Sequence, residues 1–427
     1  MATVETGERL ASAVFRLVED LFPQGPPFAL RLWNGETLAP AGEGPAATVI
    51  LKDPRALARL LRDPPDLALG EAYVAGELEI EGDLEALLAA LEREAPRLSP
   101  ARLARALKDA AALRRELARP GLAARLRGRV HSKARDRQAI RHHYDVGNEF
   151  FALWLDDWMI YSCGYFPEGD EDLDAAQEKK LRHTLKKLRL KPGEHLLDIG
   201  SGWGGLGLFA ARHFGVRVTG VTLAEEQVKH ANAWARELGL AERARFLPLD
   251  YRDVEGRFDK LVSVGMAEHV GRPMLGRYFA KAHGLLAPGG LFLHHVITRG
   301  PVQSRFDEGL ATGDFLRRYV FPDGEILPLW EHLRAAEEAG FEVRDVEDWR
   351  EHYARTLRHW VRRLEARWDR AVRLVGEGRA RVWKLYMGVA AYQFAAGHLS
   401  VHQVLLARPD RAGRVPLPPS RADLYAG

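Results

Sequence analysis

Apolar runs of about five residues alternate with longer amphipathic stretches between positions 141 and 350. Short runs rich in Val, Ile and Leu are typical of buried strands, and the longer stretches have the periodicity of helices. Strands that alternate with helices predict a parallel α/β sheet covered by helices on both faces. The predicted strands are 195–199, 216–221, 245–249, 260–264 and 291–297, and the predicted helices are 204–213, 224–238 and 273–286.

The residues before this region predict a small N-terminal α+β domain over 1–95. An alternating run ends at Asn34-Gly35, which is a strong signal for a hairpin turn. Asp53 and Pro54 have the residue types of a helix cap and a first helical position. The predicted elements are strands at 28–33 and 47–51 and helices at 54–61 and 84–91.

The chain after the sheet region divides into a helical part and a tail. Residues 356–406 predict helices with a break near 376–378, and we expect these added C-terminal helices to complete a catalytic domain over 141–408. The stretch 409–427 is rich in Pro and Arg and predicts a loose tail.

Charge is distributed unevenly along the chain. The 427 residues carry a formal net charge of only +3, yet the stretch from Arg97 to Arg141 holds fourteen Lys or Arg against three acidic residues. We expect a basic helical linker over 96–140, which could be a solvated helix or a surface for an anionic partner. No groove-reading motif or interleaved aromatic residue accompanies these arginines, so we expect no nucleic acid as partner. Anionic lipid headgroups fit better, each nearby Lys or Arg contributing about 1 kcal/mol.

Compartment and membrane topology follow from what the sequence lacks. It has one cysteine, Cys163, so no internal disulfide can form and a reducing compartment is expected. The N-terminus is acidic, without the pattern of a signal peptide, and no apolar run is long enough to span a bilayer. We therefore expect a cytoplasmic protein that associates peripherally with the inner face of the cell membrane.

A glycine-rich turn follows the first predicted strand of the sheet. It begins with Asp198-Ile-Gly200-Ser-Gly202-Trp-Gly204 and leads into a helix, so backbone N–H groups can face a nucleotide-like ligand. The second strand ends at Thr222, where dinucleotide enzymes carry an acidic residue for the ribose, and no P-loop Lys-Ser/Thr follows. This pattern favours S-adenosylmethionine over a pyrophosphate, and nothing in it calls for a metal.

The third strand of the predicted sheet ends at Asp250-Tyr251, a carboxylate followed by an aromatic ring. Ligands of open α/β sheets bind at the carboxyl ends of the strands, where the glycine turn and Thr222 also lie. We therefore expect Asp250 and Tyr251 to meet the adenine.

Eight segments in the same order resemble the cyclopropane-fatty-acyl-phospholipid synthases and the mycolic acid cyclopropane synthases. Among them are His-Tyr-Asp-Val-Gly-Asn at 143–148, Tyr-Ser-Cys-Gly-Tyr-Phe at 161–166 and Leu-Asp-Ile-Gly-Ser-Gly-Trp-Gly-Gly at 197–205. The others are 218–222, 250–253, 262–271, 292–297 and 319–324. The extra N-terminal domain matches the arrangement of the longer, phospholipid-acting branch, whose members are often dimers.

The resemblance implies a Rossmann-like class I methyltransferase fold and a reaction. S-adenosylmethionine donates its methyl to a cis double bond of a phospholipid acyl chain, and a base then removes a proton from the added carbon so that a cyclopropane ring closes. A bicarbonate ion serves as that base in the family. The matching positions for bicarbonate are Glu268, His295 and Tyr353 by side chain, and Cys163 and Ile297 by backbone.

The resemblance also implies the residues around the methyl donor. Tyr161 and Ser162 match positions near the methionine end, with Gly200 and Gly202 beneath it. The full set of expected cofactor residues is Tyr161, Ser162, Asp198, Gly200, Gly202, Thr222, Gln227, Asp250 and Tyr251.

Some assignments have alternatives. His294 points to the opposite face of the strand from His295 and is left out, and His352 competes with Tyr353 if the match slips by one residue. Cys163 has no Cys-His-Asn context, so we predict that it is not a nucleophile.

The function also has alternatives. A related lipid enzyme would leave a methylene or methyl branch on the acyl chain. A small-molecule N-methyltransferase would share the fold and the donor, but the basic linker and the N-terminal domain argue against it.

Overall fold

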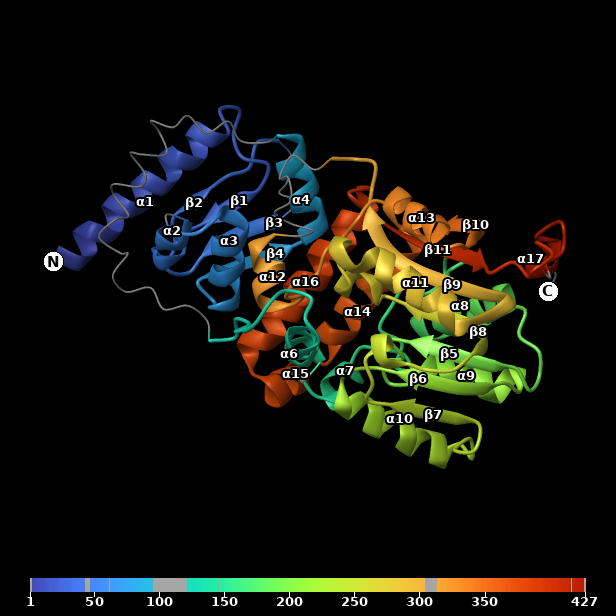
Figure 1. Ribbon diagram of the computed structural model, residues 1–427. Helices are drawn as coiled ribbons and strands as arrows, with labels where there is room; N and C mark the ends of the chain where they lie inside the picture. Colours follow the sequence, from blue (N-terminus) through green and yellow to red (C-terminus); the bar gives the residue numbers. More distant parts are fainter. Residues whose placement is uncertain are drawn as a thin grey trace. The chain divides into compact units, whose positions relative to one another are not determined.

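The computed structural model describes residues 2–42, 47–60, 62–94, 121–144, 146–303, 313–415 and 417–425 (Figure 1). The chain forms two compact units. Most of the basic linker expected from the sequence, 95–120, lies outside the described residues. The first unit contains Met1–Ala124, Val302–Val320 and Arg367–Ala396, and the second contains Arg125–Pro301, Phe321–Ala366 and Gly397–Gly427.

The second unit is built on a sheet of seven strands in the order β10-β11-β9-β8-β5-β6-β7. Strands β5, β6, β7, β8 and β9 run parallel, as the sequence predicts. Their bounds are His195–Ile199 (β5), Arg217–Val221 (β6), Ala244–Leu247 (β7), Phe258–Val264 (β8) and Leu286–Arg299 (β9).

The sheet differs from the prediction at its other end, where it is mixed. β11 (Leu399–Ala407) pairs antiparallel with both β9 and β10 (Glu342–Asp348). The prediction of a helix through residue 406 is therefore wrong. β11 lies between two other strands, and eight of its nine residues are buried. Burial on both faces removes the two-residue alternation of a strand, and periodicity alone cannot separate such a segment from a buried helix.

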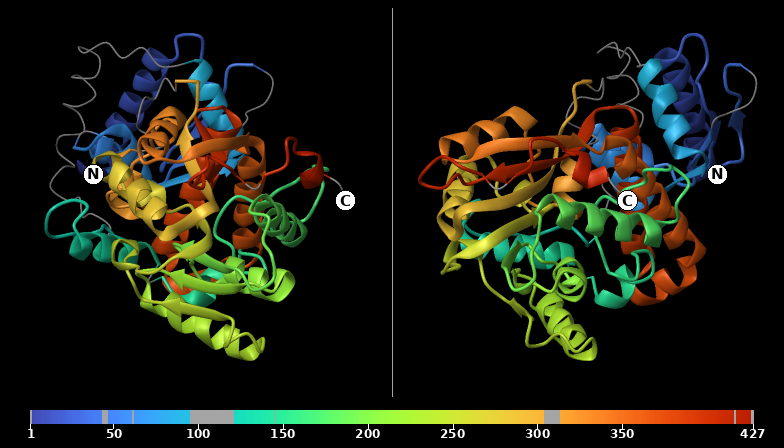
Figure 2. Two further views of the ribbon diagram at one scale, coloured as in Figure 1. Left: turned by 45° about the vertical axis from the view of Figure 1, so that its right-hand side comes forward. Right: turned by 90° about the vertical axis from the view of Figure 1, so that its right-hand side faces the viewer.

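Helices cover both faces of this sheet, as predicted (Figure 2). On one face, α8 (Leu173–Lys187), α9 (Gly205–Phe214) and α10 (Glu225–Glu237) pack over Leu196 and Leu293. On the other face, α11 (Leu275–Leu285) and α13 (Leu329–Glu338) pack over Leu197 and Phe292. The alternation of Leu196 and Leu197 between the two cores is the two-residue period of a strand that is buried on both sides.

Further elements complete the second unit. α6 (Lys133–Tyr144) and α7 (Asn148–Phe151) precede the sheet, and α14 (Arg350–Ala366) follows β10. The tail expected to be loose contains α17 (Ala422–Tyr425) and is held by ion pairs from Arg421 to Asp345 and from Arg189 to Asp423. Three short 3-10 helices lie at the strand ends, η2 (Tyr251–Asp253), η3 (Ala267–His269) and η4 (Arg272–Met274).

The first unit contains a four-stranded sheet in the order β2-β1-β3-β4. Strands β1 (Ala29–Arg31) and β2 (Thr37–Leu38) form the predicted hairpin, and β3 (Ala47–Leu51) and β4 (Leu78–Gly82) extend the sheet. The helices of the N-terminal part are α1 (Ala2–Leu21), α2 (Arg55–Leu60), α3 (Pro65–Val74) and α4 (Leu84–Arg93).

Three helices from later in the chain join this first unit. They are α12 (Asp314–Tyr319), α15 (Trp368–Val375) and α16 (Glu377–Ala395). α16 packs on α3 and α4, and Tyr319 of α12 donates to the buried Glu71 of α3 at 2.8 Å. Part of the predicted catalytic domain over 141–408 therefore belongs to the same compact unit as the N-terminal sheet. The sequence does not predict this grouping, because it depends on contacts between residues far apart in the chain.

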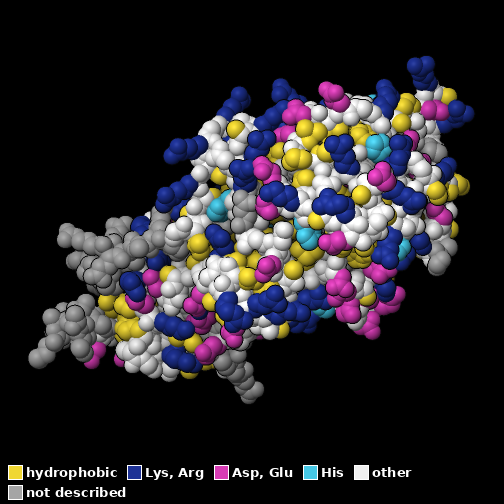
Figure 3. All heavy atoms as spheres, turned by 90° about the horizontal axis from the view of Figure 1, so that it is seen from below, with side chains coloured by type: hydrophobic (Ala, Val, Ile, Leu, Met, Phe, Trp, Pro, Cys, Tyr) yellow, Lys and Arg dark blue, Asp and Glu magenta, His cyan; other side chains and the backbone are white. Residues whose placement is uncertain are grey.

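The surface mixes charges of both signs. The face in Figure 3 carries Lys and Arg side chains interspersed with Asp and Glu. No described helix is long and apolar enough to cross a bilayer.

Candidate active site

The glycine turn lies where β5 ends and α9 begins, as the sequence predicts. Gly200, Gly202 and Gly204 have φ angles of 85°, 52° and 89°, a region that side chains rarely tolerate. A Cβ at Gly205 would lie 1.9 Å from the carbonyl oxygen of Trp158. The turn therefore depends on glycine both for its backbone conformation and for close packing against the preceding loop.

Two neighbouring cavities open at the carboxyl ends of the parallel strands. The first encloses about 780 Å³ and the second about 540 Å³ of space between atoms. Gly200, Thr222, Met266 and His269 line both. The first cavity is also lined by Tyr161, Ser162, Asp198, Gly202 and Gln227, and the second by Asp250 and Tyr251. The structure thus brings all nine expected cofactor residues to one continuous edge of the sheet.

Unpartnered polar atoms in the first cavity fit a polar ligand. Asp198 is 3% exposed and its Oδ2 has no hydrogen-bond partner, and the Nε2 of Gln227 has none either. Burial raises the pKa of the Asp198 carboxyl to about 7, and the nearby Lys180 charge opposes this shift. Buried polar atoms without partners carry a free-energy cost that a zwitterionic amino-acid group would relieve.

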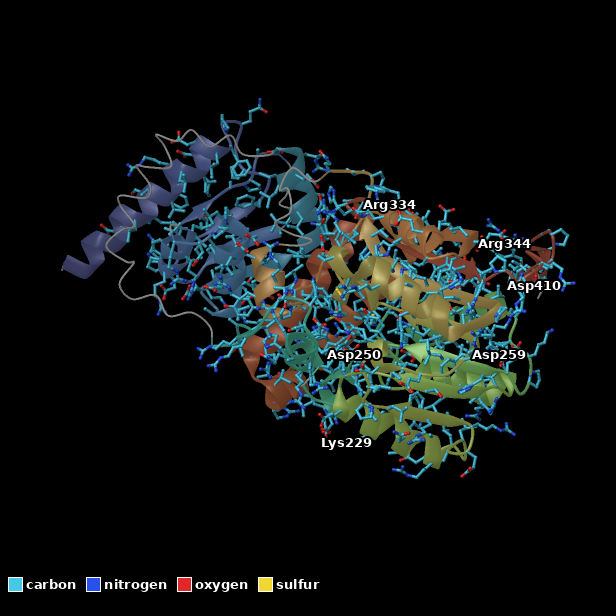
Figure 4. The ribbon with its side chains drawn as sticks, viewed as in Figure 1. Lys229, Asp250, Asp259, Arg334, Arg344 and Asp410 are labelled. Atoms are coloured by element: carbon cyan, nitrogen blue, oxygen red, sulfur yellow. The ribbon has the colours of Figure 1, made fainter. Side chains whose placement is uncertain are left out.

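The second cavity carries a fixed charge at its edge. Asp250, labelled in Figure 4, accepts from the backbone N of Arg252 at 2.9 Å and from its Nε at 2.8 Å. Burial opposes ionisation of Asp250, but these hydrogen bonds hold the pKa of its carboxyl below the usual value. The ring of Tyr251 beside it is 9% exposed and offers a flat face. An aromatic face beside a carboxylate suits a purine base and a ribose.

A second group of predicted residues lies at the ends of β8 and β9. The Oε1 of Glu268 accepts the backbone N–H of Ile297 at 2.7 Å, so this N–H is already engaged. The Oε2 of Glu268 is buried without a partner, and burial raises the pKa of the carboxyl to about 7. The carboxyl can thus exchange a proton near neutral pH, as an acid–base group must.

His295 lies two residues before Ile297 in β9. It is 2% exposed, and neither ring nitrogen has a hydrogen-bond partner. Burial, followed by the charges of Lys180 and Lys187, holds the pKa of the imidazole well below 6.5. The ring is therefore neutral at pH 7 and offers one donor and one acceptor.

Trp349 connects the remaining members of this group. Its ring meets that of His295 edge-on at 5.6 Å. Its carbonyl oxygen accepts from the N of Tyr353 at 3.1 Å and from the thiol of Cys163 at 3.8 Å. Trp349 thus contacts three of the predicted bicarbonate residues, His295, Tyr353 and Cys163, which come from separate parts of the chain.

The structure bears on the alternatives among these residues. His352 accepts from the N of Phe166 at 3.1 Å, whereas Tyr353 is buried with its ring 6.0 Å from that of Trp360. His294 lies on the other face of β9, within 3.3 Å of both Tyr278 and His332. His294 therefore lies on the face opposite His295, as predicted, whereas the choice of Tyr353 over His352 stays a prediction.

Lys180, His269, Met266 and several aromatic residues were missed by the sequence analysis. Lys180 lines the first cavity although it stands on a polar helix, where a lysine normally indicates solvent. Tyr161 is surrounded by aromatic rings with centroids 5.3 to 6.3 Å from its own. These rings belong to His143, Tyr144, Phe151, Trp154 and Trp360. The density of aromatic residues over 143–161 was the available signal.

Comparisons with known proteins agree with this geometry. The family model described as mycolic acid cyclopropane synthetase matches residues 131–404, and a domain of unknown function, DUF7884, matches 17–99. A probable fatty acid methyltransferase of Pseudomonas putida is 41% identical over 401 residues, covering 93% of this chain and 96% of that protein. The cyclopropane-fatty-acyl-phospholipid synthase of Escherichia coli K12 is 34% identical over 371 residues, covering 86% and 89%.

Solved structures agree as well. The crystal structure of mycolic acid cyclopropane synthase CmaA1 complexed with SAH and CTAB superposes with a TM-score of 0.61 at 30% identity, covering 64% of this chain and 98% of that one. The methyltransferase fold, the glycine turn with its cavities and the family match therefore lead to one conclusion. This chain belongs to the mycolic acid cyclopropane synthetase family and is an S-adenosylmethionine-dependent lipid methyltransferase.

Proposed function

We propose that this enzyme converts a cis double bond of a phospholipid acyl chain into a cyclopropane ring, with bound bicarbonate as the base. The observation that carries the proposal is that Glu268, which follows β8, and His295, which lies in the neighbouring strand β9, each hold buried polar atoms without a hydrogen-bond partner. Glu268 has a carboxyl oxygen without a partner, and His295 is neutral with two unpartnered ring nitrogens. A small anion that both donates and accepts hydrogen bonds fits these atoms.

The proposed reaction begins when the alkene attacks the methyl carbon of the donor. The bond between sulfur and methyl breaks, S-adenosylhomocysteine leaves as a neutral thioether, and the positive charge passes to the acyl chain. An alkene is a weak nucleophile, so the residues must hold the two reactants in line. Bound bicarbonate supplies the base for the proton on the added carbon. His295 donates an N–H to hold the anion, Glu268 exchanges a proton with it, and Tyr353 and the backbone of Cys163 complete its surroundings.

The aromatic rings around Tyr161 support a cationic reaction path. Aromatic faces stabilise positive charge, most strongly where water is excluded. The ring centroid of Trp360 lies 5.3 Å from that of Tyr161 and 6.0 Å from that of Tyr353. Aromatic contacts therefore extend from the donor cavity to the proposed base site. This continuity supports a path on which positive charge develops between the donor and the base.

The described part of the basic segment supports a membrane substrate. Arg125, Arg127, Arg129, Lys133 and Arg137 are partly or wholly exposed. We propose that they rest on anionic headgroups at the inner face of the membrane, so that an acyl chain can reach the site. A homodimer stays a prediction from the resemblance.

A branched product is the second candidate. The 41% identical relative is named a probable fatty acid methyltransferase, which leaves open whether the ring closes. Both candidates use the same donor cavity and form the same first bond. The ring closes when the added carbon loses a proton directly, and a methylene branch forms when a hydride shift along the acyl chain precedes that loss. A methyl branch that keeps a double bond forms when a chain carbon loses the proton instead.

Incubation of the full chain with methyl-labelled S-adenosylmethionine and vesicles of unsaturated phosphatidylglycerol, with and without bicarbonate, tests the proposal. We expect label in the lipid and slower transfer when bicarbonate is removed. No label in the lipid would overturn the proposed substrate. Equal rates with and without bicarbonate would overturn the proposed base.

A further inference from the structure

Helix α8 has an unusual buried face. Gln177, Lys180, Thr184 and Lys187 are all at most 1% exposed, and they follow one another at spacings of three, four and three residues. Residues at such spacings lie on one side of a helix. Four polar side chains buried along one face need partners in the structure that this face contacts.

One partner is the loop that carries the predicted contacts Tyr161, Ser162 and Cys163. Residues 160–166 form no helix or strand, so hydrogen bonds from side chains fix their backbone. Gln177 donates its Nε2 to the carbonyl oxygen of Ser162 at 2.8 Å, and Lys180 donates its Nζ to the hydroxyl of the same serine at 2.8 Å. α8 thus holds this loop at Ser162 through both backbone and side chain.

The charge of Lys180 also acts on both halves of the site, the donor cavity and the base site. Among the described residues, it is the only lysine or arginine that lines the first cavity. Asp156, Asp198 and the thiol of Cys163 face it, and its charge also acts on His295. An ammonium between the donor cavity and the base site influences charge in both.

We propose that Lys180 is a positioning residue for the reaction. Its ammonium holds Ser162, which lines the first cavity, and the adjoining Cys163 backbone, and its charge favours the ionised form of Asp198 in the same cavity. This inference rests on the proposed function for the role of Cys163, whereas the effect on the donor does not need the lipid reaction.

The titration of the neighbouring groups defines a pH window. Burial lowers the pKa of Lys180 to about 8, partly offset by Asp156, Cys163 and Asp198. Burial raises the pKa of Asp198 to about 7 and that of Asp156 to about 6. Lysine and both aspartates are therefore charged together only around pH 7 to 8, and Lys180 loses its charge above that range.

The test compares Lys180→Met with Lys179→Met, which removes the neighbouring, exposed lysine that pairs with Glu168 at the surface and with the partly buried Glu171. Calorimetry with S-adenosylhomocysteine and kcat/KM for the methyl donor are measured from pH 6 to 9. A hydrogen bond to a charged group accounts for about tenfold or more in either constant. In Lys180→Met we expect this loss of about tenfold or more. The fall in affinity and kcat/KM that the wild type shows above about pH 8 should also be absent from this variant. Lys179→Met should keep the wild-type constants and the wild-type fall above about pH 8.

Ser162→Ala, which keeps the lysine, separates positioning from simple structural support. If Lys180 acts through Ser162, the double variant loses no more kcat/KM than the worse single variant, whereas independent roles give additive losses. If Lys180→Met does not fold, Ser162→Ala must by itself lower kcat/KM about tenfold and move the alkaline decline to lower pH, because the ammonium loses an acceptor.

Three results would overturn the inference. They are wild-type affinity for S-adenosylhomocysteine in Lys180→Met, an unchanged fall in kcat/KM at alkaline pH in that variant, and additive losses of kcat/KM in the double variant. Absence of lipid labelling by the wild type would instead overturn the proposed function. The binding profile with S-adenosylhomocysteine would then still decide the role of Lys180.

Discussion

Replacing Glu268 with Gln should stabilise the fold while abolishing the reaction. Burial raises the pKa of the Glu268 carboxyl from 4.5 to about 7, so the folded state disfavours the ionised form. A group with a raised folded pKa contributes stability at low pH and loses it as the pH rises through the folded value. Ionising the buried carboxyl therefore lowers the unfolding free energy by at most about 3 kcal/mol above pH 7. The same destabilisation is about 1.4 kcal/mol near pH 5.5.

Gln keeps an oxygen that can accept the Ile297 N–H, so the contact at 2.7 Å survives without the charge. Urea denaturation followed by tryptophan fluorescence at pH 5.5 and 8.5 gives the difference in unfolding free energy between Glu268→Gln and the wild type. We expect the variant to be the more stable, by about 2 kcal/mol more at pH 8.5 than at pH 5.5. Glu351→Gln, at an exposed carboxylate, is the matched control and should show no such pH dependence. A Glu268→Gln variant less stable than the wild type at pH 8.5, or a difference that does not change with pH, would refute the reasoning.

Three further predictions concern packing and the roles of individual residues. Gly205→Ala forces a Cβ to within 1.9 Å of a backbone carbonyl oxygen, so its melting temperature should fall far below that of the wild type. Gly202→Ala should fall much less, because its Cβ has open space and the substitution costs only about 1 kcal/mol of backbone strain. Equal melting temperatures of the two variants would contradict this. Cys163→Ser should keep substantial methyl transfer, because burial raises the pKa of the thiol and leaves it unreactive; complete loss with donor binding intact would make it a nucleophile. His295→Asn should lose turnover with little change in melting temperature, whereas His294→Asn should melt earlier and keep its activity per folded molecule; the reverse pattern would exchange their roles.

The parallel half of the sheet was predictable because its information is local. β5 lies where the apolar run at 195–199 predicts it, and the glycines that follow have positive φ angles that no other residue type adopts easily. β11 was not predictable in this way, because side chains on both of its faces are buried in the cores on either side of the sheet and the alternating pattern is lost.

The candidate site shows the same division. Asp198, Thr222 and Asp250 stand at strand ends, which the sequence locates, so their convergence on one edge of the sheet could be expected. Lys180 could not be found in this way, because its burial depends on tertiary packing of a helix that is polar overall. The link through Trp349 joins residues far apart in the sequence and becomes visible only in the folded chain.

Ring closure requires that a proton leave the transferred carbon. Trideuteriomethyl S-adenosylmethionine with unsaturated phospholipid vesicles tests this step directly, with the product analysed by mass spectrometry and nuclear magnetic resonance. We expect a lipid that keeps two of the three deuterium atoms and shows ring protons in place of the olefinic protons. A product that keeps all three deuterium atoms as a methyl branch, or that carries an exocyclic methylene group, would contradict it.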